Sequence, residues 1–355
     1  MRAIIAGGGT GGHLYPGIAV AEEIYRQEPE SEVLFVGTKT GIESKILPKE
    51  GYNLEIISAG GIINKNMFSQ LRSIMKMLSG FIKSFFVLRR FKPDIVIGVG
   101  GYASAPMLSA AAIMRFPAMI MEQNFFPGTT NRYLSRIVDR VVVAFEGSEK
   151  FFNRKVDVLG NPVRKGITDC KYNPGKTFTV FIFGGSQGSH AINKGIMESL
   201  EFLQKEAGQI RFLHQTGEKD YEWVNESYEK AGISAEVAPY VYNIVDMYGK
   251  SDIVICRAGA TTIAEITASG RPAILIPYPH AAHDHQRTNA EHLKSMGSAE
   301  VILEKELSGK ILADKIKYFM YNRERLKEMA EKSSRLYRQD SAHDIVKLCK
   351  FLILK

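Results

Sequence analysis

A chain of 355 residues is longer than one typical domain of roughly 100–200 residues, so its length predicts two domains. The 3 cysteines are odd in number and far apart, which excludes a disulfide framework and favours a reducing cytoplasm, and the longest weakly polar run, 103–114, is too short for the ~20 residues of a membrane span. The formal net charge of +8 favours acidic partners: nucleic acid, phosphorylated metabolites or an anionic membrane face.

The chain opens with a pattern that is typical of nucleotide-binding folds. An apolar strand at Ala3–Ala6 leads into a glycine-rich loop at 7–12, and a helix is expected from about Pro16 to Gln27. Glycines in such a loop let backbone N–H groups close on a phosphate, although a single loop of this kind is more often a tight turn. The loop matches G-x-G-x-x-G, but the second strand, Val33–Val36, ends without the acidic residue of the dinucleotide fingerprint. We therefore do not expect an NAD dehydrogenase.

The region from Ile56 to Pro93 contains no acidic residue and combines basic with apolar side chains. One apolar stripe recurs at helical spacing and is expected to pack on the sheet. The other apolar residues lie near lysines, which is the composition of a helix that binds a membrane interface. The stripe expected in the core is Leu71, Ile74, Leu78, Phe81, Phe85 and Leu88. The predicted membrane patch is Met75, Met77, Ile82 and Phe86 with Lys76 and Lys83.

Short apolar runs alternate with helical or loop segments, which indicates doubly wound parallel sheets. After a polar linker at 165–176 the pattern restarts with a strand, a second glycine loop at 184–189 and a helix. We therefore expect an α/β protein with two Rossmann-like domains facing a cleft, one of residues 1–162 plus a C-terminal helix at about 338–355, the other of residues 163–337. The predicted strands are Ala3–Ala6, Val33–Val36, Leu54–Ile57, Asp94–Val99, Ala118–Met121, Arg140–Val143, Val156–Leu159, Phe178–Phe183, Arg211–His214, Glu236–Ala238, Asp252–Cys256, Ala273–Ile276 and Glu300–Leu303.

The stretch 252–277 has the pattern strand, glycine turn, helix and strand, and ligands of parallel sheets bind beyond the carboxyl ends of the strands. Thr262 and Glu265 have the spacing of a capping box, so a helix is expected to start there. Glu265 then has two interpretations. It satisfies a backbone N–H as a helix cap, or it accepts hydrogen bonds from the two hydroxyls of a ribose. The local spacing leaves both open.

Two features near the C-terminus complete the pattern. The run His-Ala-Ala-His-Asp-His at 280–285 has the residue types of a metal site, but Pro277 and Pro279 indicate an irregular loop, so no metal is expected. The segment Ala342–Leu354 has apolar residues on nearly all sides, which predicts a buried helix.

Six motifs occur in order and together span essentially the whole chain. They are Gly8-Gly9-Thr10-Gly11-Gly12-His13, Gly100-Gly101-Tyr102, Glu122-Gln123-Asn124, Gly160-Asn161-Pro162-Val163-Arg164, Gly184-Gly185-Ser186-Gln187-Gly188 and the segment 257–265. With these motifs the chain closely resembles the MurG family, the N-acetylglucosaminyltransferases of peptidoglycan synthesis. One departure is Met121, because members of that family often have histidine directly before the Glu-Gln-Asn triplet.

The resemblance implies the two-domain GT-B glycosyltransferase fold and an inverting reaction. GlcNAc would move from UDP-GlcNAc to the C4 hydroxyl of MurNAc in undecaprenyl-linked lipid I, giving lipid II. The first domain would serve the acceptor and the membrane, and the second would bind UDP-GlcNAc. The expected partners are therefore UDP-GlcNAc, lipid I and the anionic cytoplasmic leaflet of the cell membrane, where the protein would be peripheral and serve cell wall biogenesis, cell shape and cell division. Neither a cofactor nor a nucleic acid is expected.

The resemblance also implies a set of site residues. His13 would be the general base, because a neutral imidazole of pKa about 6.5 suits proton transfer near pH 7. Glu122 is the alternative base and would need a pKa raised by burial. The acceptor side would be Gly8, Gly9, Gly101 and Tyr102. The donor side would be Thr10, Gly11, Gly12, Asn124, Arg164, Ser186, Ile244, Ala260, Thr261, Thr262, Ile263, Ala264, Glu265 and Gln286, with Ser186 at the diphosphate, Arg164 and Ile244 at the uridine end, and Asn124 and Gln286 at the sugar.

Two other functions stay open at this point. Related two-domain folds include epimerases that act on UDP-GlcNAc without any lipid. A nucleotide-sugar-binding module without catalysis would share the same glycine loops.

Overall fold

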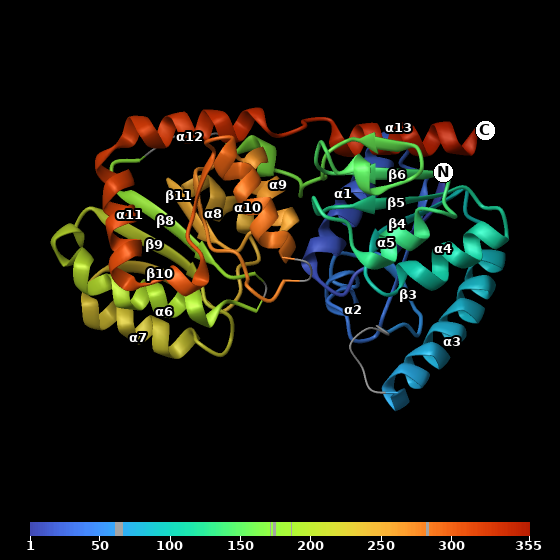
Figure 1. Ribbon diagram of the computed structural model, residues 1–355, viewed down its shortest axis with the longest axis horizontal. Helices are drawn as coiled ribbons and strands as arrows, with labels where there is room; N and C mark the ends of the chain where they lie inside the picture. Colours follow the sequence, from blue (N-terminus) through green and yellow to red (C-terminus); the bar gives the residue numbers. More distant parts are fainter. Residues whose placement is uncertain (61–66, 171, 173–174, 186, 282–283) are drawn as a thin grey trace. The chain divides into compact units, whose positions relative to one another are not determined.

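The structure is a computed structural model, which describes residues 1–60, 67–170, 172, 175–185, 187–281 and 284–355 (Figure 1). The chain divides into two compact units. The first is Met1–Arg164 together with Asp340–Lys355, and the second is Lys165–Gln339. Each unit has its own parallel sheet and its own covering helices.

The first unit contains a seven-stranded sheet with strand order β3-β2-β1-β4-β5-β6-β7. All pairs are parallel, and Ala3 of β1 lies in register between Val33 of β2 and Ile95 of β4. The central strands are apolar throughout because helices cover both of their faces. The strands are β1 (Arg2–Gly7), β2 (Glu32–Gly37), β3 (Asn53–Ile56), β4 (Ile95–Gly100), β5 (Ala118–Glu122), β6 (Arg140–Val143) and β7 (Val156–Val158).

Helices pack on both faces of this first sheet. Successive side chains of a strand point to opposite faces, so alternate residues of β1 contact different helices. On one face, α1 (Gly11–Gln27) and α13 (Ser341–Ile353) pack with Ala3 and Ile5. On the other face, residues of three helices pack with Ile4 and Ala6. These helices are α3 (Met67–Phe91), α4 (Ser104–Ile113) and α5 (Thr129–Leu134). Short helical turns lie at α2 (Glu43–Ile46) and η1 (Glu149–Phe151).

The second unit contains a six-stranded parallel sheet with strand order β10-β9-β8-β11-β12-β13. Its strands are β8 (Phe178–Phe183), β9 (Ile210–Gln215), β10 (Ser234–Ala238), β11 (Ile253–Cys256), β12 (Ala273–Leu275) and β13 (Ala299–Val301). On one face, Val180 and Ile182 pack with α6 (His190–Ser199), α7 (Tyr221–Ala231), α11 (Gly309–Tyr321) and α12 (Arg323–Arg335). On the other face, Phe181 and Phe183 contact Tyr248 of α8 (Ile244–Lys250). The remaining elements are η2 (Ile167–Asp169), η3 (Leu200–Glu206), α9 (Ala260–Ala268), α10 (His285–Ser295) and η5 (Glu304–Glu306).

The predicted fold class is confirmed, because both units are doubly wound parallel α/β domains. Within the described residues every predicted strand occurs, with ends shifted by at most two positions. Two helix predictions are wrong. Helix α1 begins at Gly11 rather than at Pro16, and Pro16 lies inside it. Helix α13 is not buried on nearly all sides, because Ile345 and Cys349 are buried while Phe351 is 53% exposed.

Among the residues that the structure describes, no helix is long and apolar enough to cross a membrane. In the same part of the chain, no three His, Cys, Asp or Glu side chains come together as a metal site. The histidine-rich run at 280–285 includes His283, which lies outside the described residues.

Candidate active site

Each sheet has one place where the strand order reverses, and ligands of doubly wound sheets bind at that place beyond the strand ends. In the first unit it lies between β1 and β4, which are followed by the first glycine loop and by Gly101. In the second unit it lies between β8 and β11, which are followed by the second glycine loop and by Arg257. The sequence motifs thus lie at the two points of strand-order reversal, where ligands of doubly wound sheets bind.

The first glycine loop, residues 7–12, folds against the loop after β4. The backbone N–H of Gly8 donates to the carbonyl of Gly100 at 3.2 Å. A Cβ at position 101 would lie 2.3 Å from the oxygen of Gly8, so only glycine fits there. The structure therefore brings the predicted acceptor-side residues of both loops together, with Tyr102 exposed beside them. Thr10, Gly11 and Gly12, which were predicted to be on the donor side, begin α1 at the end of the same loop.

Glu43 holds the first glycine loop from inside, and the sequence analysis did not identify it. Its buried carboxylate accepts the backbone N–H of Gly9 at 2.7 Å and the N–H and hydroxyl of Thr38 at 2.8 and 3.0 Å. A Cβ at Gly8, Gly37 or Gly41 would lie within 2.1–2.5 Å of this side chain. These three glycines leave the space that the Glu43 carboxylate occupies. Their spacing in the sequence matches none of the motifs described above, so the sequence did not indicate this contact.

His13 sits in the first turn of α1 against the ends of β4 and β5. Its Nδ1 lies 3.0 Å from Oε1 of the buried Gln123. A Cβ at Gly100 would lie 2.6 Å from the same Nδ1, so the glycine creates the space for the ring. Met121, at the position of the family histidine, is buried in the core with residues of α1 and α13, and its carbonyl accepts from Gln123 Nε2 at 3.4 Å.

Glu122 is buried, and both of its oxygens are already hydrogen-bonded. One accepts the N–H and the side-chain amide of Asn124 at 3.0 and 3.2 Å. The other accepts the N–H of Gly128 and the side-chain amide of Asn131, each at 2.9 Å. This carboxylate therefore organises the loop after β5, and it orients the amide of Asn124 with its nitrogen inward.

The second glycine loop, residues 184–189, is fixed by neighbours that the sequence analysis did not identify. Gln215, buried at the end of β9, donates to the carbonyl of Gly185 at 2.8 Å and accepts from the N–H of Val241 at 2.9 Å. The Arg257 guanidinium donates to Ser189 Oγ at 2.7 Å and pairs with Glu304. Ser189 starts α6 as its N-cap residue. The predicted diphosphate contact, Ser186, lies outside the described residues.

Helix α9 contradicts the predicted capping box. It begins at Ala260 after the extended Gly259, and no side chain caps it. Thr262 therefore lies inside the helix rather than at its start, and Glu265 is a full turn too late to cap it. Glu265 is 2% exposed and accepts from the hydroxyl of Tyr248 at 3.3 Å. Most other donor-side residues in this helix are buried: Ala260, Thr261, Ile263 and Ala264.

The remaining donor-side residues are each held in place locally. The Gln286 oxygen accepts the N–H groups of Ala258 and Tyr278 at 3.2 and 3.0 Å, so its amide hydrogens point away from the backbone. Ile244 begins α8 directly after its N-cap residue, Asn243. Arg164, the last residue of the first unit, stacks over the ring of Tyr15 at 4.1 Å.

Helix α3 carries the predicted membrane patch, with one correction. Met75 and Phe86 are 66% and 65% exposed, Ile82 and both lysines are exposed, and Met77 is half-buried. Leu78, which was expected in the core stripe, is 60% exposed. The buried side of the helix instead uses small residues, because a Cβ at Gly80 would lie 2.0 Å from the oxygen of Ser58. Predictions for Leu71 and Ile74 fall on side chains outside the described residues.

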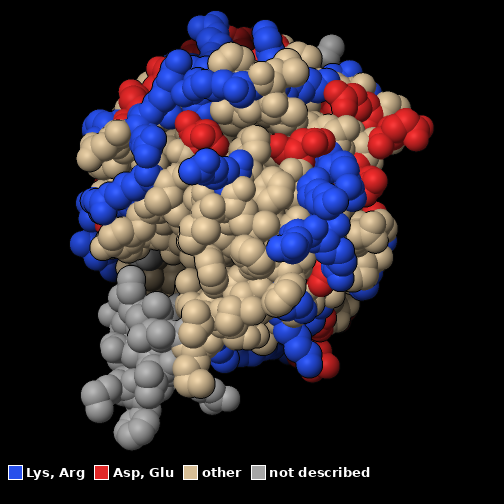
Figure 2. All heavy atoms as spheres, turned by 90° about the vertical axis from the view of Figure 1, so that its right-hand side faces the viewer, with Lys and Arg blue, Asp and Glu red and all other residues tan. Residues whose placement is uncertain are grey.

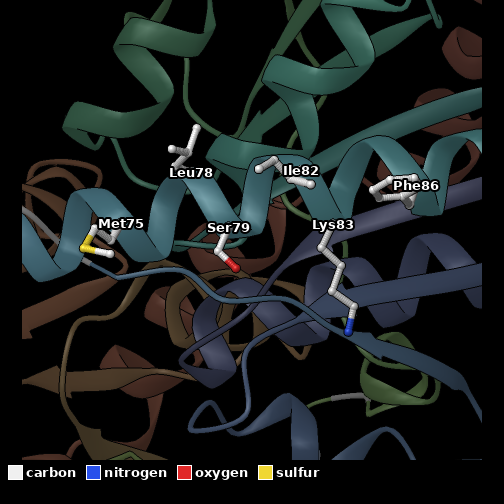
Figure 3. A pocket seen from close by; sticks show the side chains of 6 residues that line it. All are labelled: Met75, Leu78, Ser79, Ile82, Lys83 and Phe86. Atoms are coloured by element: carbon white, nitrogen blue, oxygen red, sulfur yellow. The ribbon is translucent and has the colours of Figure 1, made fainter.

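The exposed residues of α3 form a shallow apolar groove. Figure 3 shows its lining along successive turns of the helix, with one lysine among apolar side chains. Figure 2 shows the side of the molecule on which α3 lies, where lysine and arginine border a broad band of uncharged atoms. We define the α3 patch as the residues that line this groove: Met75, Leu78, Ser79, Ile82, Lys83 and Phe86.

Comparisons with known proteins agree across the whole chain. Residues 3–143 match the glycosyltransferase family 28 N-terminal domain, and residues 179–348 match the glycosyltransferase family 28 C-terminal domain. A Geobacter metallireducens protein is 48% identical over 353 residues, with 98% of this chain and 97% of the relative covered. It is named UDP-N-acetylglucosamine--N-acetylmuramyl-(pentapeptide) pyrophosphoryl-undecaprenol N-acetylglucosamine transferase. A protein of the same name from Geobacter sulfurreducens is 46% identical with the same coverage. The crystal structure of Acinetobacter baumannii MurG is similar, with a TM-score of 0.77 and 29% identity over 98% of this chain and 99% of that one.

Proposed function

This chain belongs to glycosyltransferase family 28, and on that premise we propose that it transfers GlcNAc from UDP-GlcNAc to the C4 hydroxyl of MurNAc in lipid I, giving lipid II for peptidoglycan synthesis. The observation that carries the proposal is 46–48% identity, over nearly the full length of both chains, to relatives whose names state this transfer. The inverting reaction needs a base at the acceptor hydroxyl and a site that accepts UDP as the leaving group.

We assign the base to His13 at the edge of the first sheet. As the C4 oxygen bonds to the anomeric carbon, its proton passes to the free imidazole nitrogen. The bond from the anomeric carbon to the diphosphate breaks on the opposite side, and UDP leaves with the electron pair. Glu122 is a poorer candidate, because four donors already occupy its two oxygens.

We assign the UDP diphosphate to the second glycine loop rather than to the first. A helix N-terminus offers free N–H donors and a partial positive charge, and α6 follows that loop directly. The first loop already contains an anion of its own, because Glu43 accepts the N–H of Gly9. An added phosphate there would meet this buried carboxylate. Neutral sugar hydroxyls suit the first loop better.

The donor sugar and the nucleoside are assigned to residues whose polar groups are already oriented. Glu265 is a buried carboxylate in the second turn of α9 and would accept the two ribose hydroxyls. Gln286 would donate, because its oxygen is occupied by two backbone N–H groups. Asn124 would accept, because its nitrogen is directed to Glu122. Arg164 and the backbone of Ile244 complete the uridine end.

We further propose that the protein docks on the anionic cytoplasmic leaflet through the α3 patch. Four of the six residues that line it are large apolar side chains, and a further lysine, Lys76, is exposed beside them. Apolar burial and attraction to acidic headgroups together bind such helices to an interface. A lipid-linked acceptor would then reach the first domain, and the product would support cell wall growth, cell shape and division.

One assay tests the proposed reaction. The protein is incubated with UDP-GlcNAc and a lipid I analogue, and UDP and the disaccharide-lipid product are measured. Release of UDP together with the disaccharide supports transfer. Free ManNAc or its nucleotide would mean epimerisation, and donor binding without turnover would mean a binding module. Either of the last two results overturns the proposal.

A further inference from the structure

We propose that Gln123 is a positioning residue that fixes the tautomer of His13, with the proton on Nδ1 and the lone pair on Nε2. The inference concerns the imidazole itself, and its consequence for catalysis rests on the proposed role of His13 as the base. In this proposal Gln123 acts on the reaction through its contact with His13.

The orientation of the Gln123 amide follows from its other hydrogen bonds. Its Nε2 donates to the carbonyl of Val99 at 3.1 Å and to the carbonyl of Met121 at 3.4 Å. Turning the amide over would place its oxygen against both carbonyl oxygens and lose both bonds, which is costly for a buried group. The amide oxygen must therefore face His13.

A carbonyl oxygen can only accept, so the His13 Nδ1 that lies 3.0 Å from it must be the donor. In a neutral imidazole the other nitrogen then carries the lone pair. Among the described residues, no side chain or backbone group forms a hydrogen bond with His13 Nε2, which leaves this nitrogen for the acceptor hydroxyl. With the opposite tautomer, Nε2 would present a hydrogen and could not take a proton.

The neutral amide of Gln123 accepts the hydrogen bond from Nδ1–H and so fixes the tautomer, but it does not stabilise the charged form of the ring. A carboxylate at position 123 would also accept from Nδ1–H, but its negative charge would favour the charged imidazolium over the neutral ring. The two carboxylates on neighbouring segments are engaged elsewhere: Glu122 with the loop after β5, and Glu43 with Gly9 and Thr38. The imidazole is therefore set up as a neutral base.

The tautomer is measured by ¹⁵N NMR of histidine-labelled protein at a pH where the ring is neutral. We expect a protonated Nδ1 and an unprotonated Nε2 for His13, identified as the signal lost in His13→Gln. In Gln123→Met the Nδ1 partner is lost, and we expect a mixed or reversed tautomer. The matched control is Gln215→Met, which removes a buried amide of the second unit and should leave the His13 signal unchanged.

Kinetics give the second readout. Gln123→Met should lower kcat by about 10²–10⁴-fold, the range for a histidine base in the wrong tautomer, with little change in the KM for UDP-GlcNAc. Gln123→Glu keeps an acceptor for Nδ1–H, so His13 should have the same tautomer as in the unsubstituted protein. The added negative charge should shift the pH–rate profile to higher pH.

Three results would overturn the proposal: a proton on Nε2 in the unsubstituted protein, an unchanged tautomer in folded Gln123→Met, or equal kcat loss in both Gln123 variants. If Gln123→Met does not fold, the unsubstituted protein and Gln123→Glu still decide the question. An active His13→Ala protein would remove the base assignment but leave the tautomer result standing, so the two failures are distinguishable.

Discussion

The carboxylate of Glu43 accepts the backbone N–H of Gly9 at 2.7 Å, across 34 positions of sequence. A glycine loop at a helix N-terminus normally offers its N–H groups to an external anion. Here the protein supplies that anion itself, in a pocket that three glycines keep open. The two glycine loops of the chain are therefore not equivalent, although their sequences look alike.

Glu43→Ala should reverse this difference. It leaves the N–H of Gly9 and the polar groups of Thr38 without their acceptor, so we expect the first domain to lose about 1.5–3 kcal/mol of unfolding free energy. Inorganic phosphate should then raise the melting temperature of the variant and not that of the unsubstituted protein. Differential scanning calorimetry measures both, with the exposed Glu30→Ala as the control. A variant that is indifferent to phosphate would show that the freed loop binds no anion.

Glu265→Ala should weaken the binding of UDP-GlcNAc. The buried carboxylate would otherwise accept from ribose hydroxyls, and losing hydrogen bonds to a charged group costs about 1.5–3 kcal/mol, or roughly 10- to 100-fold in Kd. Isothermal titration calorimetry checks this, with Glu226→Ala on the exposed face of α7 as the control. Unchanged affinity in the folded protein would mean that Glu265 serves the fold, for example through its bond with Tyr248, and does not bind the ribose.

His13→Ala should lower kcat by about 10²–10⁴-fold, the usual contribution of a general base, while the affinity for UDP-GlcNAc changes much less. The control is His343→Ala, a surface histidine of the same domain that pairs with Glu23. Steady-state kinetics with a lipid I analogue separates the two effects. A near-normal kcat in folded His13→Ala would transfer the role to another group.

Ile82→Asp combined with Phe86→Asp should abolish sedimentation with anionic vesicles, because the pair places two charges in the α3 patch. Binding of UDP-GlcNAc should be unaffected, and high salt should partly release the unsubstituted protein. The matched control is Phe351→Asp with Leu354→Asp, two exposed apolar residues of the same domain. Persistent sedimentation of the α3 variant would place membrane contact on another surface.

His214 should make the second domain sensitive to acid. Burial lowers its pKa from 6.5 to about 3, and its two nitrogens are hydrogen-bonded to Tyr228 and Asn193. Below pH 6.5 His214 becomes protonated in the unfolded chain, whereas in the folded domain it stays neutral until about pH 3. The free energy of unfolding therefore falls as the pH falls through this window. The loss should be about 2 kcal/mol between pH 6.5 and 5.

Denaturant unfolding of the second domain at several pH values measures this slope. His214→Gln should flatten it, while His190→Gln, at an exposed site, should leave it unchanged. An equal slope in His214→Gln would assign the acid sensitivity to other groups.

The central strands could be predicted from the sequence because helices cover both faces of each sheet, so strands such as β4, β8 and β11 are almost continuous apolar runs. The glycine loops followed for a similar reason, since only glycine fits where Gly101 meets Gly8. The partners of His13 could not be predicted, because Gln123 lies 110 positions away and only the folded sheet brings the two together.

Two local patterns misled for physical reasons. Thr262 and Glu265 have capping-box spacing, but the extended Gly259 starts α9 before them. The apolar stripe of α3 was expected to face the core, but close packing there is provided by small residues such as Gly80, which turns Leu78 outward. Helical periodicity locates a face of a helix without saying whether large or small side chains make the tightest contact.

The position of α13 has a consequence for synthesis on the ribosome. The sheet of the first domain is covered on one face by α1 and by Ile345, Val346, Cys349 and Leu352. These four residues are translated only after the entire second domain, so this face stays partly bare while residues 165–339 are made. We expect the nascent first domain to be protease-sensitive and chaperone-dependent until then, and pulse proteolysis of stalled chains with and without residues 340–355 would detect the difference. In this view the core of the first domain is completed only when α13 packs against it, after the second domain has been made.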